Sequence, residues 1–324
     1  MDHAAVSSPT RTKSIVASAV AAVAFGALPS AAFAEIELGA GFAVTGFIDT
    51  SIYYNDLDDL GTVAGVDQVE IDFLYAGSNG VSAQVDLEYN DVDGTFVEQA
   101  IINYQFNDNF SMKAGRFLSY SGFEAEEPTG LYQYSGSGYA PYFYGYYQQG
   151  ISAAWKGDLF GFTASLVNSA FDPLERDAST PGYELGASLT PLDGLTAKLF
   201  YIVNRYDNES DDDEIINFWT SYVIGGFTFA GEYNTADYAG GGSGDGFLLM
   251  ANYATGNWGF TFRYSDFEIE NAAGFTTVED SAITLSPSYK VGKNLLVVAE
   301  YRYDDFGSGG GDSNSIALEA LFTF

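Results

Sequence analysis

Apolar and polar residues alternate along most of this chain with a period of two residues. From Phe42 onward one parity is apolar and the other is polar, as in Phe42, Val44, Ile48, Ile52 and Tyr54 against Thr45, Asp49 and Ser51. Successive side chains of a strand point to opposite faces of its sheet. The pattern therefore predicts β-strands that each have one apolar and one polar face.

Turn signals divide these alternating stretches into antiparallel pairs. The shorter turns fall at residues 78–80, 107–109, 157–158, 191–194, 225–226, 255–257 and 292–294. The first of them contains Asn79-Gly80, and Asn-Gly is among the strongest hairpin signals that a sequence offers. Continued to the last stretch, Ser315 to Phe324, the pattern predicts sixteen strands.

The connections between the predicted strands alternate in length along the chain. One set contains two to four residues, and the interleaved set is mostly longer. A soluble β-sandwich or solenoid has no reason to sort its loops in this way, whereas a transmembrane β-barrel has short turns at one end and longer loops at the other. We therefore predict an all-β, sixteen-stranded antiparallel transmembrane β-barrel.

One connection is much longer than the others. Residues Ser119 to Tyr147 separate the fifth and sixth predicted strands, and they include ten aromatic side chains together with Glu124, Glu126 and Glu127. Loops of this length inside a compact domain are uncommon, and disordered segments are poor in aromatic residues. We therefore predict that this segment folds into the mouth of the barrel.

The amino-terminal residues have the composition of an export signal. Arg11 and Lys13 precede the apolar run Ile15 to Leu28, and Ala32-Phe33-Ala34 follows before Glu35. This order predicts a signal peptide over residues 1–34 and a barrel domain over residues 35–324. No later run reaches the roughly 18 apolar residues that a membrane-spanning helix needs, so a membrane crossing would have to use strands.

The charge of the chain excludes one class of partner. Without the leader, 43 acidic residues stand against ten basic ones. Nucleic acid requires a basic surface, so it is not expected as a partner. Cysteine is absent, so no disulfide stabilises the exported chain, and the closure of the fold must supply its stability.

The two predicted faces of the strands differ as those of a barrel wall should. Aromatic residues recur at the strand ends of the apolar face, as expected for the interfacial girdles of a barrel in lipid. The polar face carries the following ionisable residues: Asp49, Glu70, Asp72, Asp86, Glu88, Glu184, Glu232, Glu300, Glu319, Lys113, Lys156, Lys198, Arg263, Lys290 and Arg302. Burying so many charges in a dry core would be very costly, so we expect water inside the barrel.

These features together resemble a Gram-negative outer-membrane porin. The resemblance covers the whole chain after the leader and includes the final strand, which ends on Phe324. The stretches Gly46-Phe47-Ile48-Asp49, Ala114-Gly115-Arg116-Phe117 and Gly122-Phe123-Glu124, with Pro128 downstream, resemble more narrowly the OmpL-like β-barrel porins.

The resemblance implies a location, an assembly route and a constriction. It implies that the loop after the fifth strand narrows the channel, that Phe324 is part of the signal read by the barrel-assembly machinery, and that the chain forms homotrimers in the outer membrane. General porins place arginines opposite the acids of that loop, and few bases here could do so. Arg116 has the parity of Met112 and Ala114. Either it lies on the apolar face and has no such role, or the register of this strand differs from the one assigned.

Catalytic and metal chemistry find little support in the sequence. The only histidine is His3 in the leader, so neither a histidine base nor the usual transition-metal ligands are present beyond it, and we expect no enzyme activity and no cofactor. The acidic run Asp207 to Glu214 is either a solvated loop or a site for Ca²⁺, although it lacks the spacing of a calcium loop. The glycine-rich stretch Gly240 to Asp245 is interpreted as a loop tip.

The predicted function is passive diffusion of small hydrophilic solutes, with a preference for cations. Glu124, Glu126 and Glu127 are the candidate residues of the constriction, and Lys113 and Lys156 are the nearest candidate opposing charges. Lipid and lipopolysaccharide are the expected surroundings. Two alternatives stay open: a sugar-selective channel whose loop tyrosines stack on sugar rings, and a plugged structural or adhesive barrel.

Overall fold

The computed structural model describes residues 36–324 except 58–60, 91, 93, 125, 208–210 and 308. The predicted leader lies outside these residues. The strands are β1 (Ile36–Gly39), β2 (Phe42–Asn55), β3 (Thr62–Ala76), β4 (Val81–Asn90), β5 (Gly94–Asn107), β6 (Phe110–Leu118), β7 (Tyr147–Lys156), β8 (Phe160–Val167), β9 (Gly182–Leu192), β10 (Leu195–Asn204), β11 (Asp213–Ile224), β12 (Phe227–Asp237), β13 (Ser243–Thr255), β14 (Trp258–Glu270), β15 (Thr276–Val291), β16 (Leu295–Asp305) and β17 (Asp312–Thr323).

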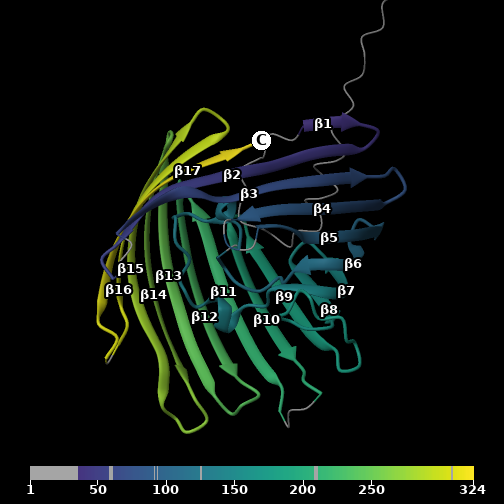
Figure 1. The fold of residues 1–324 in the computed structure, drawn as a ribbon. Helices are drawn as coiled ribbons and strands as arrows, with labels where there is room; N and C mark the ends of the chain where they lie inside the picture. The colour runs from purple at the N-terminus through teal and green to yellow at the C-terminus, as the bar shows by residue number, and fades with distance from the viewer. Residues whose placement is uncertain are drawn as a thin grey trace, which may run out of the picture.

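Strands β2 to β17 form a closed antiparallel barrel of sixteen strands. Each strand pairs with its neighbours in sequence, and β17 closes the wall by pairing with β2 from Ser315↔Asn55 to Thr323↔Phe47. Figure 1 shows the tilted strands running around the wall, with β17 lying beside β2. Closure leaves no unpaired strand edge between β2 and β17, as strands in lipid require. The predicted architecture is confirmed.

The first strand is an addition that the alternation pattern did not predict. β1 forms a hairpin with β2 in which Ile36 lies opposite Val44, beyond the point where β17 ends on the same edge. The hairpin turns through Gly39, Ala40 and Gly41, all of which have positive φ angles. This geometry favours glycine, and the pattern of apolar residues contains no sign of so short a strand.

The connections are sorted by length as predicted. All seven predicted short turns join consecutive strands at one end of the barrel, and β6 and β7 are separated by residues 119–146 at the other end. No helix in the described residues is long and apolar enough to cross a membrane.

The apolar parity of the strands faces outward and the polar parity faces inward. In β2, Ile48 and Ile52 are exposed, while Asp49 and Ser51 are buried at 5% and 6% exposure. The pattern is the inverse of that in a soluble barrel, which would bury its apolar face. The outer surface is therefore suited to hydrocarbon. Arg116 lies on this outer parity as its position predicts, with Nη1 donating to the carbonyl of Val97 at 2.6 Å.

The inner face is less uniformly polar than predicted. On strands β10 to β14 it carries a buried apolar patch formed by Phe200, Ile202, Ile215, Trp219, Leu248, Met250, Phe267 and Ile269. The period-two pattern identifies which residues share a face, but it does not identify what covers that face. Here the inner patch is covered by aromatic residues that follow β6.

Phe324 contributes directly to the closure of the barrel. Its backbone exchanges two hydrogen bonds of 3.0 Å with Gly46, and Thr45 Oγ1 donates to its carbonyl oxygen at 2.8 Å. These bonds continue the β17–β2 ladder to the last residue. The position agrees with a terminal residue that matters for assembly, and its role as an assembly signal stays a prediction.

Candidate functional site

The residues between β6 and β7, called segment 119–146 below, contain two short helical turns. These are η1 (Pro128–Gly130) and α2 (Ala140–Phe143), and both begin with proline in the first turn. Backbone N–H groups and side chains of segment 119–146 form hydrogen bonds with side chains of β2, β9, β11, β12, β14 and β16. The segment is therefore fixed to strands distributed over more than half of the wall.

Two buried glutamates hold the beginning of the segment. Glu184 of β9 accepts from Ser119 Oγ at 2.5 Å and from the backbone N–H of Tyr120 at 3.0 Å. Glu232 of β12 accepts from the backbone N–H of Phe123 at 3.1 Å. A carboxylate that accepts several hydrogen bonds is a strong anchor, because each bond to a charged group is stronger than a neutral one.

Two tyrosines of the segment also bind Glu232. Tyr139 donates its hydroxyl to Oε2 at 2.7 Å, and Tyr144 donates to the same atom. Burial raises the pKa of both tyrosines well above its ordinary value, with the charge of Glu232 acting in the same direction. Both hydroxyls therefore stay protonated and can serve as donors.

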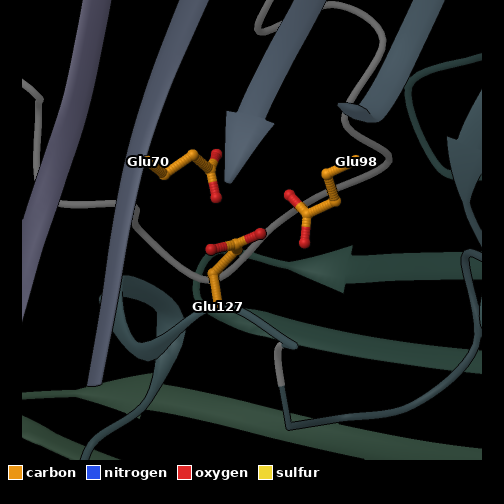
Figure 2. A group of neighbouring side chains, drawn as sticks. All are labelled: Glu70, Glu98 and Glu127. Carbon is orange, nitrogen blue, oxygen red and sulfur yellow. The ribbon is translucent and has the colours of Figure 1, made fainter. Parts of the chain in front are cut away.

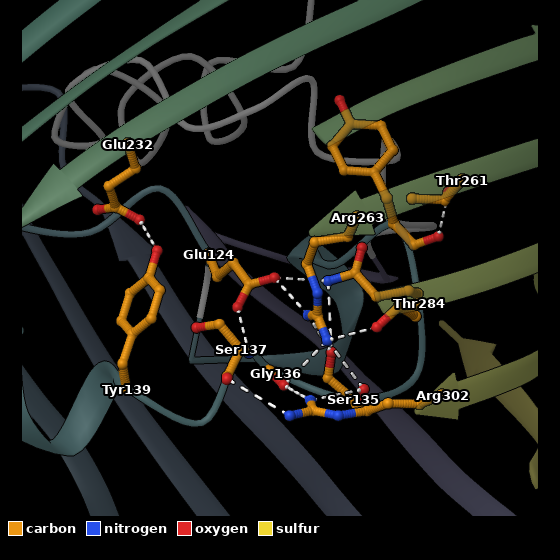
Figure 3. A network of polar contacts seen from close by, with 12 residues as sticks. Glu124, Ser135, Gly136, Ser137, Tyr139, Glu232, Thr261, Arg263, Thr284 and Arg302 are labelled. Atoms are coloured by element: carbon orange, nitrogen blue, oxygen red, sulfur yellow. Dashed lines mark hydrogen bonds and ion pairs between the residues drawn. The ribbon is translucent and has the colours of Figure 1, made fainter. Parts of the chain in front are cut away.

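A buried ion pair joins Glu124 of the segment to β14, and the same arginine also binds the middle of the segment. Arg263 of β14 is fully buried, and its Nη1 lies 2.6 Å from Oε1 of Glu124. The same guanidinium donates to the Ser135 carbonyl at 2.5 Å and to the Gly136 carbonyl at 3.1 Å. Arg302 of β16 also donates to the Gly136 carbonyl, and Figure 3 shows both arginines converging on these residues.

The aromatic side chains of the segment are mostly used for packing. Tyr139 and Phe143 are fully buried, and together with Phe123 and Tyr144 they cover the apolar patch of the inner face. Their rings meet Phe267 and Trp219 in edge-to-face contacts, with Tyr139 and Phe267 separated by 6.0 Å between centroids. These contacts explain why so many aromatics occur in a connection between two strands.

The inner face of β3 to β5 carries an acidic wall, defined as Glu70, Asp72, Asp86, Glu88 and Glu98. Glu70 lies directly opposite Glu88 in the β3–β4 ladder, and Asp72 lies opposite Asp86. Like charges directly opposite each other destabilise a sheet. The ion pairs among the described residues are Arg205 with Asp212, Arg263 with Glu124, and Arg302 with Asp280 and Asp304. None of these pairs includes a carboxylate of the acidic wall.

Segment 119–146 brings a further carboxylate to the acidic wall. Carboxylate oxygens of Glu70, Glu98 and Glu127 all lie within 4.8 Å of one another, and Figure 2 shows the three groups pointing toward a common centre. Glu127 accepts a hydrogen bond from the Tyr147 hydroxyl at 3.1 Å. Burial raises the pKa of Glu127 to about 7, despite its hydrogen bonds and with a contribution from the nearby Asp72.

A β-bulge places Glu98 in this group. The β4–β5 register shifts between Asp86 and Leu87, which lie opposite Gln99 and Val97, so that Glu98 is the extra residue. The bulge lets both Glu98 and Gln99 face inward, and Gln99 Nε2 donates to Asp86 at 2.7 Å. Bulges often redirect a side chain in this way near functional sites.

The candidate residues of the constriction lie in different surroundings. Glu124 is bound to Arg263, Glu127 joins the acidic wall, and Glu126 is exposed. Lys113 is buried on the inner face, with its Nζ 4.2 Å from the Phe117 ring centroid and 4.1 Å from that of Tyr120.

Lys156 lies apart from the other candidates. It is exposed at the end of β7 that is remote from segment 119–146, nine residues after Tyr147. At about 3.3 Å per residue this places it roughly 30 Å along the strand from the segment. The structure therefore does not bring Lys156 together with the three loop glutamates.

Sequence reasoning missed the bases that do contact the segment. Arg263 and Arg302 were recognised as residues of the inner face, but nothing in their spacing showed that they would meet Glu124 and Ser135. Glu98 was missed because a bulge interrupts the alternation at this point. The only sequence signal for Glu98 as a site residue was its acidic side chain.

The fold is similar to that of known porins. The most similar structures include Salmonella typhi OmpF in complex with daunomycin, with a TM-score of 0.73 and 14% identity over 90% of this chain and 100% of that one. OmpT of Vibrio cholerae has a TM-score of 0.68 and 17% identity, over 90% of this chain and 100% of that one. An anion-selective porin from Comamonas acidovorans has a TM-score of 0.66 and 14% identity, over 87% of this chain and 99% of that one. No curated protein matches the sequence.

The sequence itself also matches a family model. The family is described as putative beta-barrel porin-2, OmpL-like, and the match covers residues 64–324. That range includes all strands from β4 to β17 and the whole of segment 119–146. The chain belongs to the OmpL-like β-barrel porin family, whose fold is that of outer-membrane porins.

Proposed function

We propose that this porin lets small hydrophilic solutes diffuse passively across the outer membrane, that segment 119–146 narrows the channel, and that cations are preferred. The contacts of the segment support the narrowing, because Glu127 reaches the acidic wall while Glu124 reaches Arg263. The preference for cations rests on the acidic wall. Uncompensated carboxylates beside a narrow aqueous path raise the local concentration of cations.

The two inner sides of the barrel differ in how their charges are balanced. Arg263 and Arg302 bind Glu124, Asp280, Asp304 and backbone carbonyls, so their charge is largely matched. The acidic wall has no such partner among the described residues. Since one structural neighbour is an anion-selective porin, the fold does not decide the sign, and the proposal depends on these side chains.

Single-channel recording in a planar bilayer tests the proposed channel. We expect discrete, long-lived openings in potassium chloride. A barrel plugged by segment 119–146 would stay silent, and a sugar-selective channel would be blocked by its sugar. Tyr139, Tyr144 and Tyr147 are buried at 8% exposure or less, so their rings are unavailable for stacking, whereas Tyr146 is 39% exposed. Blockade by a sugar therefore decides between the two kinds of channel.

Replacing Glu126 and Glu127 with glutamine should weaken the preference for cations. A charge about 8 Å from the ion path is worth about 0.5 kcal/mol even at the dielectric constant of water, which is roughly a twofold change in local K⁺. Glu124 is omitted because Arg263 neutralises it. The measurement is the zero-current potential under a potassium chloride gradient.

Asp211→Asn with Asp212→Asn is the matched control, since it also replaces two carboxylates with amides, here in the connection between β10 and β11. Asp212 already pairs with the exposed Arg205 at 3.4 Å, and exposed charges are screened by salt. An equal loss of selectivity in the two double variants would contradict a dominant role for the segment.

Further features of the porin assignment are proposals as well. We propose that residues 1–34 are removed on export, that the barrel-assembly machinery recognises the strand ending at Phe324, and that lipid and lipopolysaccharide surround the apolar outer face. We also propose a homotrimer. One of the structural neighbours, OmpT of Vibrio cholerae, is described in a trimer form.

A further inference from the structure

We propose that Glu70, Glu98 and Glu127 bind a divalent cation, with Ca²⁺ as the best fit, and that this cation ties segment 119–146 to the acidic wall. The proposal goes beyond passive diffusion, because it assigns the channel a specific ion site. Two carboxylates come from the wall, on β3 and β5, and the third comes from the segment (Figure 2).

The spacing of the oxygen atoms suits a single ion. Oxygens that bind Ca²⁺ lie about 2.3–2.6 Å from it, so two ligands can be at most about 5.2 Å apart. One carboxylate oxygen from each of the three glutamates lies within 4.8 Å of those of the other two. A second group, formed by Glu70, Asp72 and Asp86, meets the same limit and shares Glu70.

Unused acceptor atoms provide an independent indication of a missing positive charge. Oε2 of Glu70 and Oε2 of Glu98 are inaccessible and accept no hydrogen bond, although both residues are more than nine-tenths buried. Oδ1 of Asp86, which is fully buried, is also without a donor. Buried polar atoms are nearly always satisfied, so such a concentration of orphaned carboxylate oxygens points to a cation.

The chemistry of the site selects a hard ion. All available ligands are oxygens, and beyond the leader the chain contains neither cysteine nor histidine, so the soft ligands of zinc and copper are missing. Ca²⁺ accepts roughly six to eight oxygens in flexible geometry, whereas Mg²⁺ requires a near-ideal octahedron and retains water. Two clusters of three carboxylates that overlap at Glu70 offer ligands in more than one arrangement, which suits the more flexible Ca²⁺.

Luminescence of Tb³⁺, displaced by Ca²⁺, tests the site in the folded barrel in detergent. Tyr147 lies beside the site, since its hydroxyl is 3.1 Å from Glu127, and it can sensitise the bound lanthanide. We expect saturable binding that Ca²⁺ displaces and Mg²⁺ displaces less well. In the Glu70→Gln/Glu98→Gln variant, the affinity for Ca²⁺ should fall at least tenfold.

The matched control is Asp245→Asn/Glu268→Gln, which removes two acids that lie opposite each other on β13 and β14. Its affinity for Ca²⁺ should equal that of the unmodified protein. If the Glu70→Gln/Glu98→Gln barrel fails to fold, Glu127→Gln tests the site instead, because Glu127 belongs to segment 119–146 and not to a strand of the barrel. Saturable binding that is unchanged in these variants, or no saturable binding at all, would overturn the proposal.

The test of the Ca²⁺ site and the test of the channel can fail independently. Binding is measured in detergent without any ion flow. A protein that conducts but does not bind Ca²⁺ would refute the site alone, and a silent barrel that binds Ca²⁺ would refute the channel alone.

Discussion

Replacing Arg263 with methionine is expected to release segment 119–146 from the wall and to enlarge the channel. The substitution keeps a side chain of similar length but leaves Glu124, which is 8% exposed, without its counter-charge. Breaking a buried pair by removing one partner costs about 3–5 kcal/mol. The segment can avoid this cost by detaching, because the barrel ladder does not depend on it.

Single-channel conductance and chymotrypsin cleavage within the segment are the measurements. We expect larger, less regular openings in Arg263→Met, together with faster cleavage at the tyrosines of residues 119–146. Unchanged conductance and unchanged protection from cleavage would contradict the assigned anchor.

Two further variants serve as controls for the Arg263 pair. Arg263→Met/Glu124→Gln removes both charges, so it should regain much of the lost attachment, as expected for coupled residues. Arg205→Met breaks an exposed pair with Asp212 at 3.4 Å and should have little effect, since exposed ion pairs are worth about 0–1 kcal/mol.

Replacing Val85 with arginine is expected to destabilise the barrel in lipid by about 2–4 kcal/mol, the cost of a basic side chain near the midplane of the membrane. Val85 lies in the middle of β4, faces outward and is opposite the exposed Phe73 of β3. Urea unfolding of the barrel in lipid vesicles measures the loss.

The neighbouring residue provides the control. Gln84 faces inward, and its Nε2 donates to Asp86 Oδ2 at 2.8 Å. In Gln84→Arg the guanidinium would lie beside that carboxylate and the rest of the acidic wall, so stability should change little or increase. Equal losses in the two variants would contradict the assigned inner and outer faces, and a larger loss in Gln84→Arg would mean that the two faces are exchanged.

The barrel could be predicted from sequence because its determinants are local. Alternation fixes the face of each residue, and turn residues such as Asn79-Gly80 fix where strands end. Closure of β17 onto β2 then follows, because an open edge in lipid would leave backbone groups unpaired.

The site could be predicted only in part, because its contacts join residues far apart in sequence. Glu124 and Arg263 are separated by 139 positions, and no local pattern relates them. Glu98 was missed because a bulge shifts the register at that point. The acids of the segment were recognised, but their different surroundings were not. Glu124 pairs with an arginine and Glu127 lies among carboxylates, and both depend on how the segment lies against the barrel strands.

The zero-current potential of the unmodified protein, measured across a planar bilayer under a potassium chloride gradient, tests the central claim most directly. An acidic wall without counter-charges predicts a potential with the sign of cation selectivity, which decreases as the salt concentration rises on both sides. A potential with the sign of anion selectivity, or the absence of any conductance, would contradict the account.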